Sequence, residues 1–205
     1  MISSAGEIGL RVDELHAEQF MRYLTHLIEW NKVINLTSII DPKEIIIKHF
    51  VDSLTALMAT SFPQNSTVLD VGSGGGFPGI PIKIVRSDIR LILLDPVQKK
   101  CSFLNSVIGL LRLRDVSTFH GTIEQYAGQP LRQLIDTIVV RALKFEWIRK
   151  DVLSLLTSKG KIVLYRTSIT ENNEIGKEFH IVSETSLTLP HESGNRVITV
   201  LEKNY

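Results

Sequence analysis

TVLDVGSGGGFPGIP, residues 67–81, joins a short apolar run to a dense run of glycines. The apolar run, residues 67–71, predicts a buried strand. Glycines that follow a strand let the backbone approach a ligand closely and adopt positive φ angles without steric cost. A turn with no ligand explains so many glycines poorly, because each one adds conformational entropy that folding must overcome. The stretch therefore predicts a first strand and a ligand-binding loop after it.

Apolar runs of strand length alternate with helical patterns after this loop. Further strands are predicted at 91–95, 116–120, 135–140 and 161–165, and a C-terminal hairpin near 180–189 and 196–203. Helices are predicted between them, near 80–85, 97–110 and 146–157. Such alternation predicts an α/β fold with a doubly wound, mostly parallel sheet and an antiparallel C-terminal strand. Ligands of such sheets bind beyond the carboxyl ends of the strands, which directs attention to Gly72, Asp95, Glu124 and Arg141.

The first 60 or so residues have a helical pattern instead. Asp13 is placed to cap a helix whose apolar positions are Leu15, Phe20, Tyr23, Leu24, Leu27 and Ile28. Asp41-Pro42-Lys43-Glu44 combines a capping residue, a proline at the first helical position and a glutamate three residues after the cap. The buried face after it is predicted to be Ile45, Ile46, His49, Phe50, Leu54, Leu57 and Met58. We expect an N-terminal helical portion, 1–62, and a main domain, 63–205, in one compact unit.

The composition excludes several classes of protein. The chain has 205 residues, of which 43% are hydrophobic and 22% charged, so it is neither disordered nor a coiled-coil rod. Its single cysteine, Cys101, excludes an internal disulfide framework and favours a reducing compartment. We find no stretch able to cross a bilayer, no signal-peptide pattern and no metal-ligand spacing, and expect a cytoplasmic protein without a membrane or metal partner.

Positive charge is concentrated in two segments. The net charge is only +1, yet residues 83–114 and 141–166 each hold seven Lys/Arg against two Asp/Glu. Two basic blocks on a neutral chain indicate a local anionic partner. The alternative is that they form solvated helix faces, and charge alone does not decide between the two.

The glycine loop fits two cofactors. Gly72, Gly74 and Gly76 match a G-x-G-x-G loop, while Gly74, Gly76 and Gly79 match the dinucleotide pattern G-x-G-x-x-G. Asp95 closes the next strand, where a carboxylate accepts both ribose hydroxyls of an adenosine or caps the following helix. Both NAD and S-adenosylmethionine contain adenosine.

Asp70 favours S-adenosylmethionine, which carries an ammonium and a sulfonium. An acidic side chain beside the loop suits these cations and suits a pyrophosphate poorly. No Lys or Arg occurs between Asp70 and Pro81 to hold a pyrophosphate. We therefore predict that Asp70, Gly72, Ser73, Gly74, Gly76 and Asp95 bind S-adenosylmethionine.

Several further segments match a known family. They are Trp30-Asn31-Lys32 with Asn35-Leu36-Thr37-Ser38 (W-N-K-x-x-N-L-T), His49 to Leu54 (H-x-x-D-S), Asp70 to Pro81 (D-x-G-S-G-x-G-x-P-G-I-P), Arg141-Ala142, and the terminal strand Arg196 to Lys203. Together they span nearly the whole chain, which resembles the small-subunit ribosomal RNA methyltransferase G family, also called glucose-inhibited division protein B. Thr122 and Arg166 stand where this family usually has Arg and Lys.

The resemblance implies a class I, Rossmann-like methyltransferase fold with N-terminal helices. It implies methyl transfer from S-adenosylmethionine to N7 of one guanosine in bacterial 16S ribosomal RNA, in the loop near the decoding site. Gly72 and Phe77 would line the cofactor pocket, Ile123 and Glu124 would flank the adenine, and Arg141 would lie near cofactor and target base. The expected partner is 16S ribosomal RNA, the small subunit or an assembly intermediate, bound by a monomer.

The remaining candidate site residues are predicted from their charge and polarity. We expect RNA contacts from Asn35, His49, Lys99, Lys100, Arg141, Lys144 and Arg166. Asn35, His49 and Asp52 either shape the guanine pocket or hydrogen-bond internally to fix the N-terminal portion. Guanine N7 is already a nucleophile, so no general base is needed, and Arg141 is expected to position an RNA phosphate or the base O6.

The residues alone do not exclude three other functions. The first is methylation of a small molecule by the same fold. The second is a non-catalytic RNA-binding or assembly factor. The third is a nicotinamide oxidoreductase that uses the Gly74-Gly76-Gly79 match.

Overall fold

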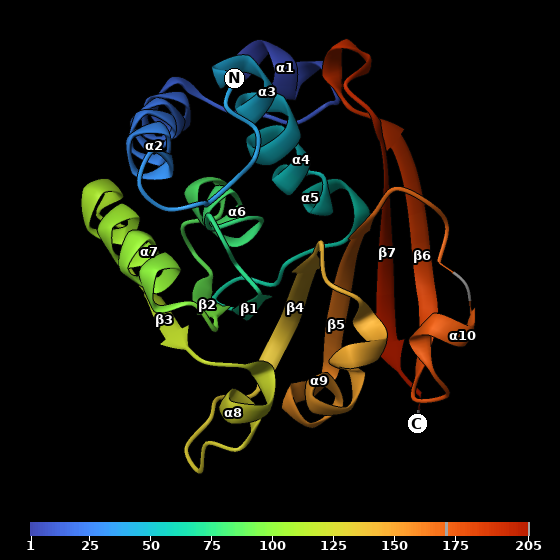
Figure 1. Cartoon of the computed structure of the whole chain (residues 1–205). Coiled ribbons are helices and arrows are strands. Elements are labelled where there is room, and N and C mark those ends of the chain that lie inside the picture. The colour runs from blue at the N-terminus through green and yellow to red at the C-terminus, as the bar shows by residue number, and fades with distance from the viewer. Residues whose placement is uncertain (171, 205) are drawn as a thin grey trace.

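One sheet organises the molecule (Figure 1). A computed structural model describes residues 1–170 and 172–204, and within them the sheet has seven strands in the order β3-β2-β1-β4-β5-β7-β6. The strands are β1 (Thr67–Val71), β2 (Arg90–Asp95), β3 (Val116–His120), β4 (Ile135–Arg141), β5 (Leu156–Arg166), β6 (Phe179–Thr188) and β7 (Asn195–Lys203). Strands β1 to β5 pair in parallel, and β7 lies antiparallel between β5 and β6. The doubly wound α/β fold and the C-terminal hairpin are confirmed.

Helices cover both faces of the sheet. They are α1 (Ile2–Glu7), α2 (Glu14–Asn31), α3 (Pro42–Ile45), α4 (Asp52–Leu54), α5 (Ala56–Ala59), α6 (Gly79–Val85), α7 (Gln98–Leu111), α8 (Ile123–Ala127), α9 (Arg149–Leu155) and α10 (Asn172–Ile175), with η1 (Ile46–Val51), η2 (Phe145–Trp147) and η3 (Pro190–Glu192) as π or 3₁₀ segments. One apolar core joins α2, α6, α7 and the other N-terminal helices to the sheet, and a second joins α8 and α9 to its other face. No helix within these described residues is long and apolar enough to cross a membrane.

Both predicted helix caps are confirmed. The Asp13 carboxylate accepts a hydrogen bond from the backbone N–H of His16 at 2.8 Å, at the start of α2. The Asp41 carboxylate accepts one from the N–H of Glu44 at 2.9 Å, at the start of α3. The Glu44 side chain does not complete a capping box, because it forms an ion pair with Lys48 at 2.7 Å.

Several local expectations are wrong. The predicted helix 146–157 is shorter, since α9 ends at Leu155 and Leu156 already pairs with Ile135 as the start of a longer β5. Met58 is 44% exposed, because it lies in the short helix α5, one residue before that helix ends and beyond the buried run that closes at Ala56. Leu15, in the first turn of α2, is 67% exposed and lies outside the apolar face.

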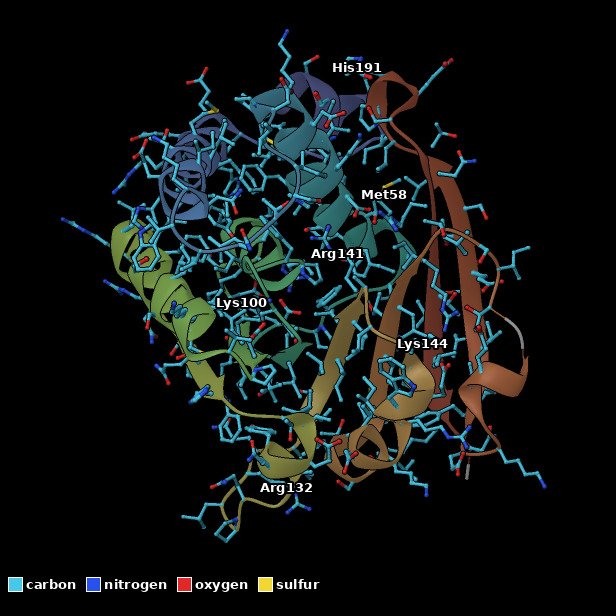
Figure 2. The ribbon with its side chains drawn as sticks, viewed as in Figure 1. Met58, Lys100, Arg132, Arg141, Lys144 and His191 are labelled. Carbon is cyan, nitrogen blue, oxygen red and sulfur yellow. The ribbon has the colours of Figure 1, made fainter. Side chains whose placement is uncertain are left out.

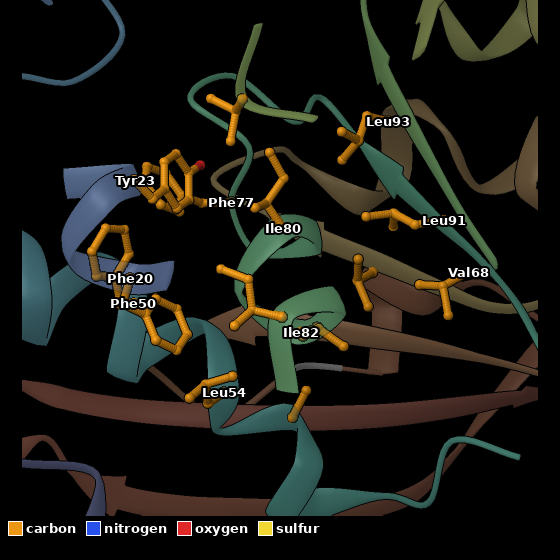
Figure 3. Close-up of a cluster of buried hydrophobic side chains, with 14 of the residues drawn as sticks. Phe20, Tyr23, Phe50, Leu54, Val68, Phe77, Ile80, Ile82, Leu91 and Leu93 are labelled. Carbon is orange, nitrogen blue, oxygen red and sulfur yellow. The ribbon is translucent and has the colours of Figure 1, made fainter. Parts of the chain in front are cut away.

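The N-terminal helices hold the glycine loop from one side (Figure 3). The rings of Tyr23 and Phe50 pack on Phe77, which follows the loop, at centroid distances of 5.7 and 5.8 Å. The Tyr23 hydroxyl also donates a hydrogen bond to the backbone carbonyl of Gly75. The helical portion therefore fixes the shape of the loop and does not merely cover the sheet.

Candidate functional site

The site lies where the strand order reverses, between β1 and β4. Val71 and Val140 pair there, so Gly72 and Arg141 leave the carboxyl ends of adjacent strands at the same level. Crevices at such points are where doubly wound sheets bind ligands. The structure thus brings the predicted glycine loop and the predicted arginine to one edge.

The loop presents open backbone at this edge. Gly72, Gly74 and Gly76 have φ angles of +73°, +57° and +89°, which only glycine adopts readily. A Cβ atom on Gly72 would meet nothing within 4 Å, so space for a ligand lies in front of it. A Cβ on Gly76 would instead lie 2.5 Å from the Tyr23 hydroxyl, so this glycine is needed for packing.

Asp95 ties the loop to the next helix. One of its carboxylate oxygens accepts a hydrogen bond from the Gly74 N–H at 2.9 Å, and the other accepts one from the Val97 N–H at 2.9 Å. The carboxylate therefore supports the start of α7 and fixes the glycine loop together. Each oxygen retains a second acceptor position, and its bond to ribose hydroxyls stays a prediction.

Asp70 is fully buried beneath the loop. Its Oδ2 accepts a hydrogen bond from the Gly79 N–H at 2.8 Å, whereas its Oδ1 is buried without a hydrogen-bond partner among the described residues. Burial raises the pKa of this carboxyl group to about 7, although the Gly79 bond and Arg141 act in the opposite direction. A cationic ligand group would satisfy the unpartnered oxygen and offset the burial of its charge.

Arg141 is anchored by three neighbours. Its Nη1 donates to the Lys48 carbonyl at 3.2 Å and to the Asp52 carboxylate at 3.0 Å, and its Nη2 donates to His49 Nδ1 at 3.3 Å. The guanidinium also lies 5.2 Å from the centre of the Phe77 ring. These bonds engage three of its five N–H donors, which leaves two to hold a ligand.

A second arginine shares the same carboxylate. Asp52 is fully buried, and Arg196 donates to both of its oxygens, from Nε at 2.5 Å and from Nη2 at 2.9 Å. We call Asp52, Arg141 and Arg196 the Asp52 cluster. It joins the N-terminal helices, β4 and β7 through charge-assisted hydrogen bonds. Asp52 therefore hydrogen-bonds internally and fixes the N-terminal portion, which is one of the two roles that the sequence left open for it.

Arg141 and Arg196 of this cluster line a cleft of about 840 Å³, and Arg141 lies near the middle of the molecule (Figure 2). Its cationic lining residues are Lys48, Arg141, Arg166 and Arg196, and we call it the arginine cleft. Its other lining residues are Ile39, His49, Ala142, Tyr165, Thr167, Ser168, Leu189, Ser193, Gly194 and Asn195. A cleft with four cationic side chains and no acidic side chain in its lining suits an anionic ligand.

His49 links this cleft to the N-terminal loop. Its ring stacks on Phe77 at 4.6 Å, and its Nε2 lies 2.7 Å from the hydroxyl of Thr37. Asn31 in turn holds Thr37 through bonds to its backbone N–H and carbonyl. Burial lowers the pKa of His49 to about 3, and the positive charge of Arg141 adds to the effect. The imidazole is therefore neutral and accepts at Nδ1 from Arg141.

This lowered pKa predicts acid sensitivity. Between pH 6.5 and 4.5 the unfolded chain takes up a proton at His49 that the folded chain excludes, so stability falls as the pH falls. We expect His49→Gln to remove roughly 2 kcal/mol of that acid-dependent loss. Urea unfolding at pH 8.0 and 4.5 measures it, with His180→Gln on the exposed β6 face as control. Parallel acid loss in wild type and H49Q would contradict the assignment.

The other predicted residues do not line the arginine cleft. Asn35 is exposed in the loop after α2, Lys99 and Lys100 lie in the first turns of α7, and Lys144 follows β4. Ile123 is buried and Glu124 exposed in the first turn of α8. Of the predicted RNA contacts, the structure gathers His49, Arg141 and Arg166 in the arginine cleft.

Thr122 has a local structural role. Its hydroxyl accepts from the Gln125 N–H, and the Gln125 side chain accepts from the Thr122 N–H, which completes a capping box at α8. Arg166, the other departure, forms an ion pair with Glu174 at 2.5 Å while lining the cleft.

Sequence reasoning did not assign Lys48, Thr37 or Arg196 to the site. Arg196 lies on a strand whose neighbours are apolar, and this is the one signal that could have pointed to it. The spacing His49-x-x-Asp52 places both side chains on one helix face, but it does not reveal which arginines they meet.

Comparisons with known proteins identify the family of the chain. The family model described as rRNA small subunit methyltransferase G matches residues 16–199. A relative of that name from Clostridium botulinum (strain Loch Maree / Type A3) is 44% identical over 142 residues, which is 69% of this chain and 59% of the relative. One from Clostridium beijerinckii is 44% identical over 144 residues, 70% of this chain and 60% of the relative. The chain thus aligns with about three-fifths of these relatives' length.

Solved structures share the fold at low identity. A mutant of MtNAS in complex with S-adenosylmethionine superposes with a TM-score of 0.62 at 14% identity, covering 94% of this chain and 76% of that one. TrmN from Thermus thermophilus gives 0.60 at 13% identity, covering 75% and 48%. These likenesses show a class I methyltransferase fold with a Rossmann-like sheet. With the family model matched over most of its length, the chain belongs to the rRNA small subunit methyltransferase G family.

Proposed function

We propose that this chain transfers a methyl group from S-adenosylmethionine to N7 of one guanosine in the decoding-region loop of bacterial 16S ribosomal RNA. The observation that supports this proposal is the position of Arg141. Its guanidinium lies over the Phe77 ring at the glycine loop, and the residue also lines the arginine cleft. One residue thus connects a place for a cationic cofactor with a place for an anionic nucleotide. Family membership supports the same substrate class.

The residues under the loop fit the cofactor. The backbone at Gly72 and Gly74 allows close approach of a ligand. Asp70, whose Oδ1 is buried without a partner among the described residues, supplies negative charge beneath the loop for the cationic part of the cofactor. Asp95, Ile123 and Glu124 would hold the adenosine. S-adenosylmethionine, when bound, supplies an electrophilic methyl group. The protein contributes alignment, and well-aligned groups gain about 7–11 kcal/mol over free encounter.

Arg141 has the role of a positioning group rather than an acid. Guanine N7 attacks with its lone pair and loses no proton, so the reaction needs no base. The two free N–H donors of Arg141 hold the base O6 or a neighbouring phosphate. The stack of His49 on Phe77 keeps this arginine and the loop at a constant separation.

The substrate is bound by cations around the cleft. Lys99, Lys100, Lys144 and Arg166, with Asn35 and His49, contact the RNA as a monomer of this chain docks on the small subunit or an assembly intermediate. Phosphate contacts of this kind make the affinity fall steeply with salt. The low net charge favours a structured partner over any free RNA.

Cofactor affinity should depend on pH through Asp70. With a pKa near 7, the free carboxyl group is mostly protonated at pH 5.5, and a bound cation favours its ionised form. We expect the affinity for S-adenosylmethionine to rise by up to about tenfold per pH unit between 5.5 and 7. Titration calorimetry should show that the affinity of Asp70→Asn is weaker and does not change with pH. Asp88→Asn, just before β2 at the other end of the strands, should keep the wild-type dependence of affinity on pH. Identical slopes in D70N and wild type would refute this role.

The activity itself is tested with labelled S-adenosylmethionine and small subunits from cells that lack this modification. Naked 16S ribosomal RNA is assayed in parallel, and cleavage chemistry selective for N7-methylguanosine maps the product. One labelled guanosine supports the proposal. Cofactor binding without incorporation would replace it with a small-molecule substrate or a non-catalytic role, and binding of NAD alone would indicate an oxidoreductase.

A further inference from the structure

Trp147 projects from the molecule beside the site. Its side chain is 65% exposed, and it is the only exposed aromatic residue in the part of the chain that the structure describes. The Lys144 ammonium lies 5.4 Å from the centre of its ring. Figure 2 shows Lys144 on the connection that follows β4, below Arg141.

Buried neighbours fix the backbone that carries the Trp147 ring. On either side of Trp147, Phe145 is fully buried and Ile148 is 5% exposed. Phe145 packs edge-on against Phe179 at 5.5 Å, and the N–H of Trp147 donates to the Lys144 carbonyl at 3.2 Å. Two core anchors therefore hold a short 3₁₀ turn whose last residue, Trp147, faces solvent.

The turn that carries the ring lies beside the arginine cleft. A second hollow, of about 310 Å³, is lined by Lys144 and Glu146, by residues at the ends of β4 and β5, and by Glu174, which forms an ion pair with Arg166. It shares Ala142, Tyr165 and Arg166 with the arginine cleft. A strand of RNA with one nucleotide in the arginine cleft would therefore pass this hollow and reach the turn that carries Trp147.

The surrounding charge favours nucleic acid over an apolar protein surface. Close to Trp147 in the sequence there are three basic residues, Lys144, Arg149 and Lys150, and two acidic ones, Glu146 and Asp151. Aromatic rings beside cations bind unpaired bases, because the base stacks on the ring while the cations hold the phosphates. Paired bases are already stacked on each other and cannot use such a ring.

We propose that Trp147 and Lys144 form a stacking platform for an unpaired base of the RNA substrate, next to the nucleotide in the arginine cleft. This platform rests on the proposed function and specifies its substrate: the methylated guanosine must lie in a loop with an unpaired neighbour, not in a duplex. Lys144 then contacts the phosphate of the stacked nucleotide.

Tryptophan fluorescence tests the contact directly. The chain has two tryptophans, Trp30 and Trp147, so Trp147→Phe leaves Trp30 as the only emitter. A hairpin of the target loop is titrated into both proteins, and a fully paired duplex of the same length serves as control. We expect the hairpin to quench wild-type emission, W147F to lose that quenching, and the duplex to have little effect.

The affinity of the protein for the hairpin measures how much the stacking on Trp147 contributes to binding. Removal of an aromatic stacking partner should weaken binding of the hairpin by about 5- to 150-fold in Trp147→Ala. W147F should retain most of the affinity, since phenylalanine also stacks. Leu131→Ala, at a site 94% exposed in the connection before β4, is the matched control and should bind as wild type does.

The two proposals fail differently. Hairpin affinity of W147A within twofold of wild type, or quenching that survives in W147F, would overturn the platform even if the wild type methylates small subunits. Loss of subunit binding with unchanged hairpin binding would also overturn it, in favour of a ribosomal protein as the contact. If the wild type methylates nothing, the proposed function fails, and the fluorescence and affinity titrations still decide the platform.

Discussion

Asp52→Asn is expected to lower the free energy of unfolding by about 3–5 kcal/mol. The carboxylate is fully buried between Arg141 and Arg196, and its removal leaves two guanidinium groups without their counter-charge. In a chain of this size the loss corresponds to a fall in melting temperature of roughly 6–20 °C. Urea unfolding followed by circular dichroism measures it.

An exposed ion pair provides the matched control. Glu29 pairs with Lys32 at 3.0 Å, but both side chains are more than 60% exposed. Glu29→Gln removes the same kind of charge and is expected to change stability by less than about 1 kcal/mol, because water already solvates both groups. Equal effects of D52N and E29Q would show that the Asp52 cluster contributes no more than a surface pair.

Arg141→Ala is expected to reduce kcat/KM for methyl transfer by about 100-fold or more. The substitution removes the two donors that hold the nucleotide and the group that packs on Phe77. Asp52 keeps its two bonds to Arg196, so the folded protein should persist and cofactor binding should change little. Filter binding and single-turnover transfer to small subunits separate affinity from rate.

Two further variants make this result specific. Arg141→Lys retains a charge but loses the fork of donors, so it should recover only a small part of the rate. Arg114→Ala removes an exposed arginine between α7 and β3 and should leave turnover unchanged. Unchanged turnover and RNA affinity in R141A would refute the positioning role.

Local signals made much of the fold predictable. The glycines at 72, 74 and 76 adopt the positive φ angles that their density indicated, and the caps at Asp13 and Asp41 begin helices as expected. Each of these features depends on residues a few positions apart. The alternation of strands and helices then restricts the topology, because parallel strands need covered faces and right-handed crossovers.

Features that depend on distant residues were not predictable. Arg196 meets Asp52 across 144 positions, and a sequence holds no signal for that distance. Met58 follows a helix break at Thr55, and the regular period assumed from the sequence did not include that break. Asp95 could be assigned to the cofactor or to a cap, and only the structure shows that it holds the loop and the helix together.

The bond between Asp52 and Arg196 also has a consequence during synthesis of the chain. A ribosome adds about 5–20 residues per second, so Arg196 follows Asp52 by about 7–30 s. Until β7 joins the sheet, the cluster lacks one of its arginines and the cleft lacks one wall. A chain in which β7 has not yet joined the sheet therefore lacks a complete arginine cleft.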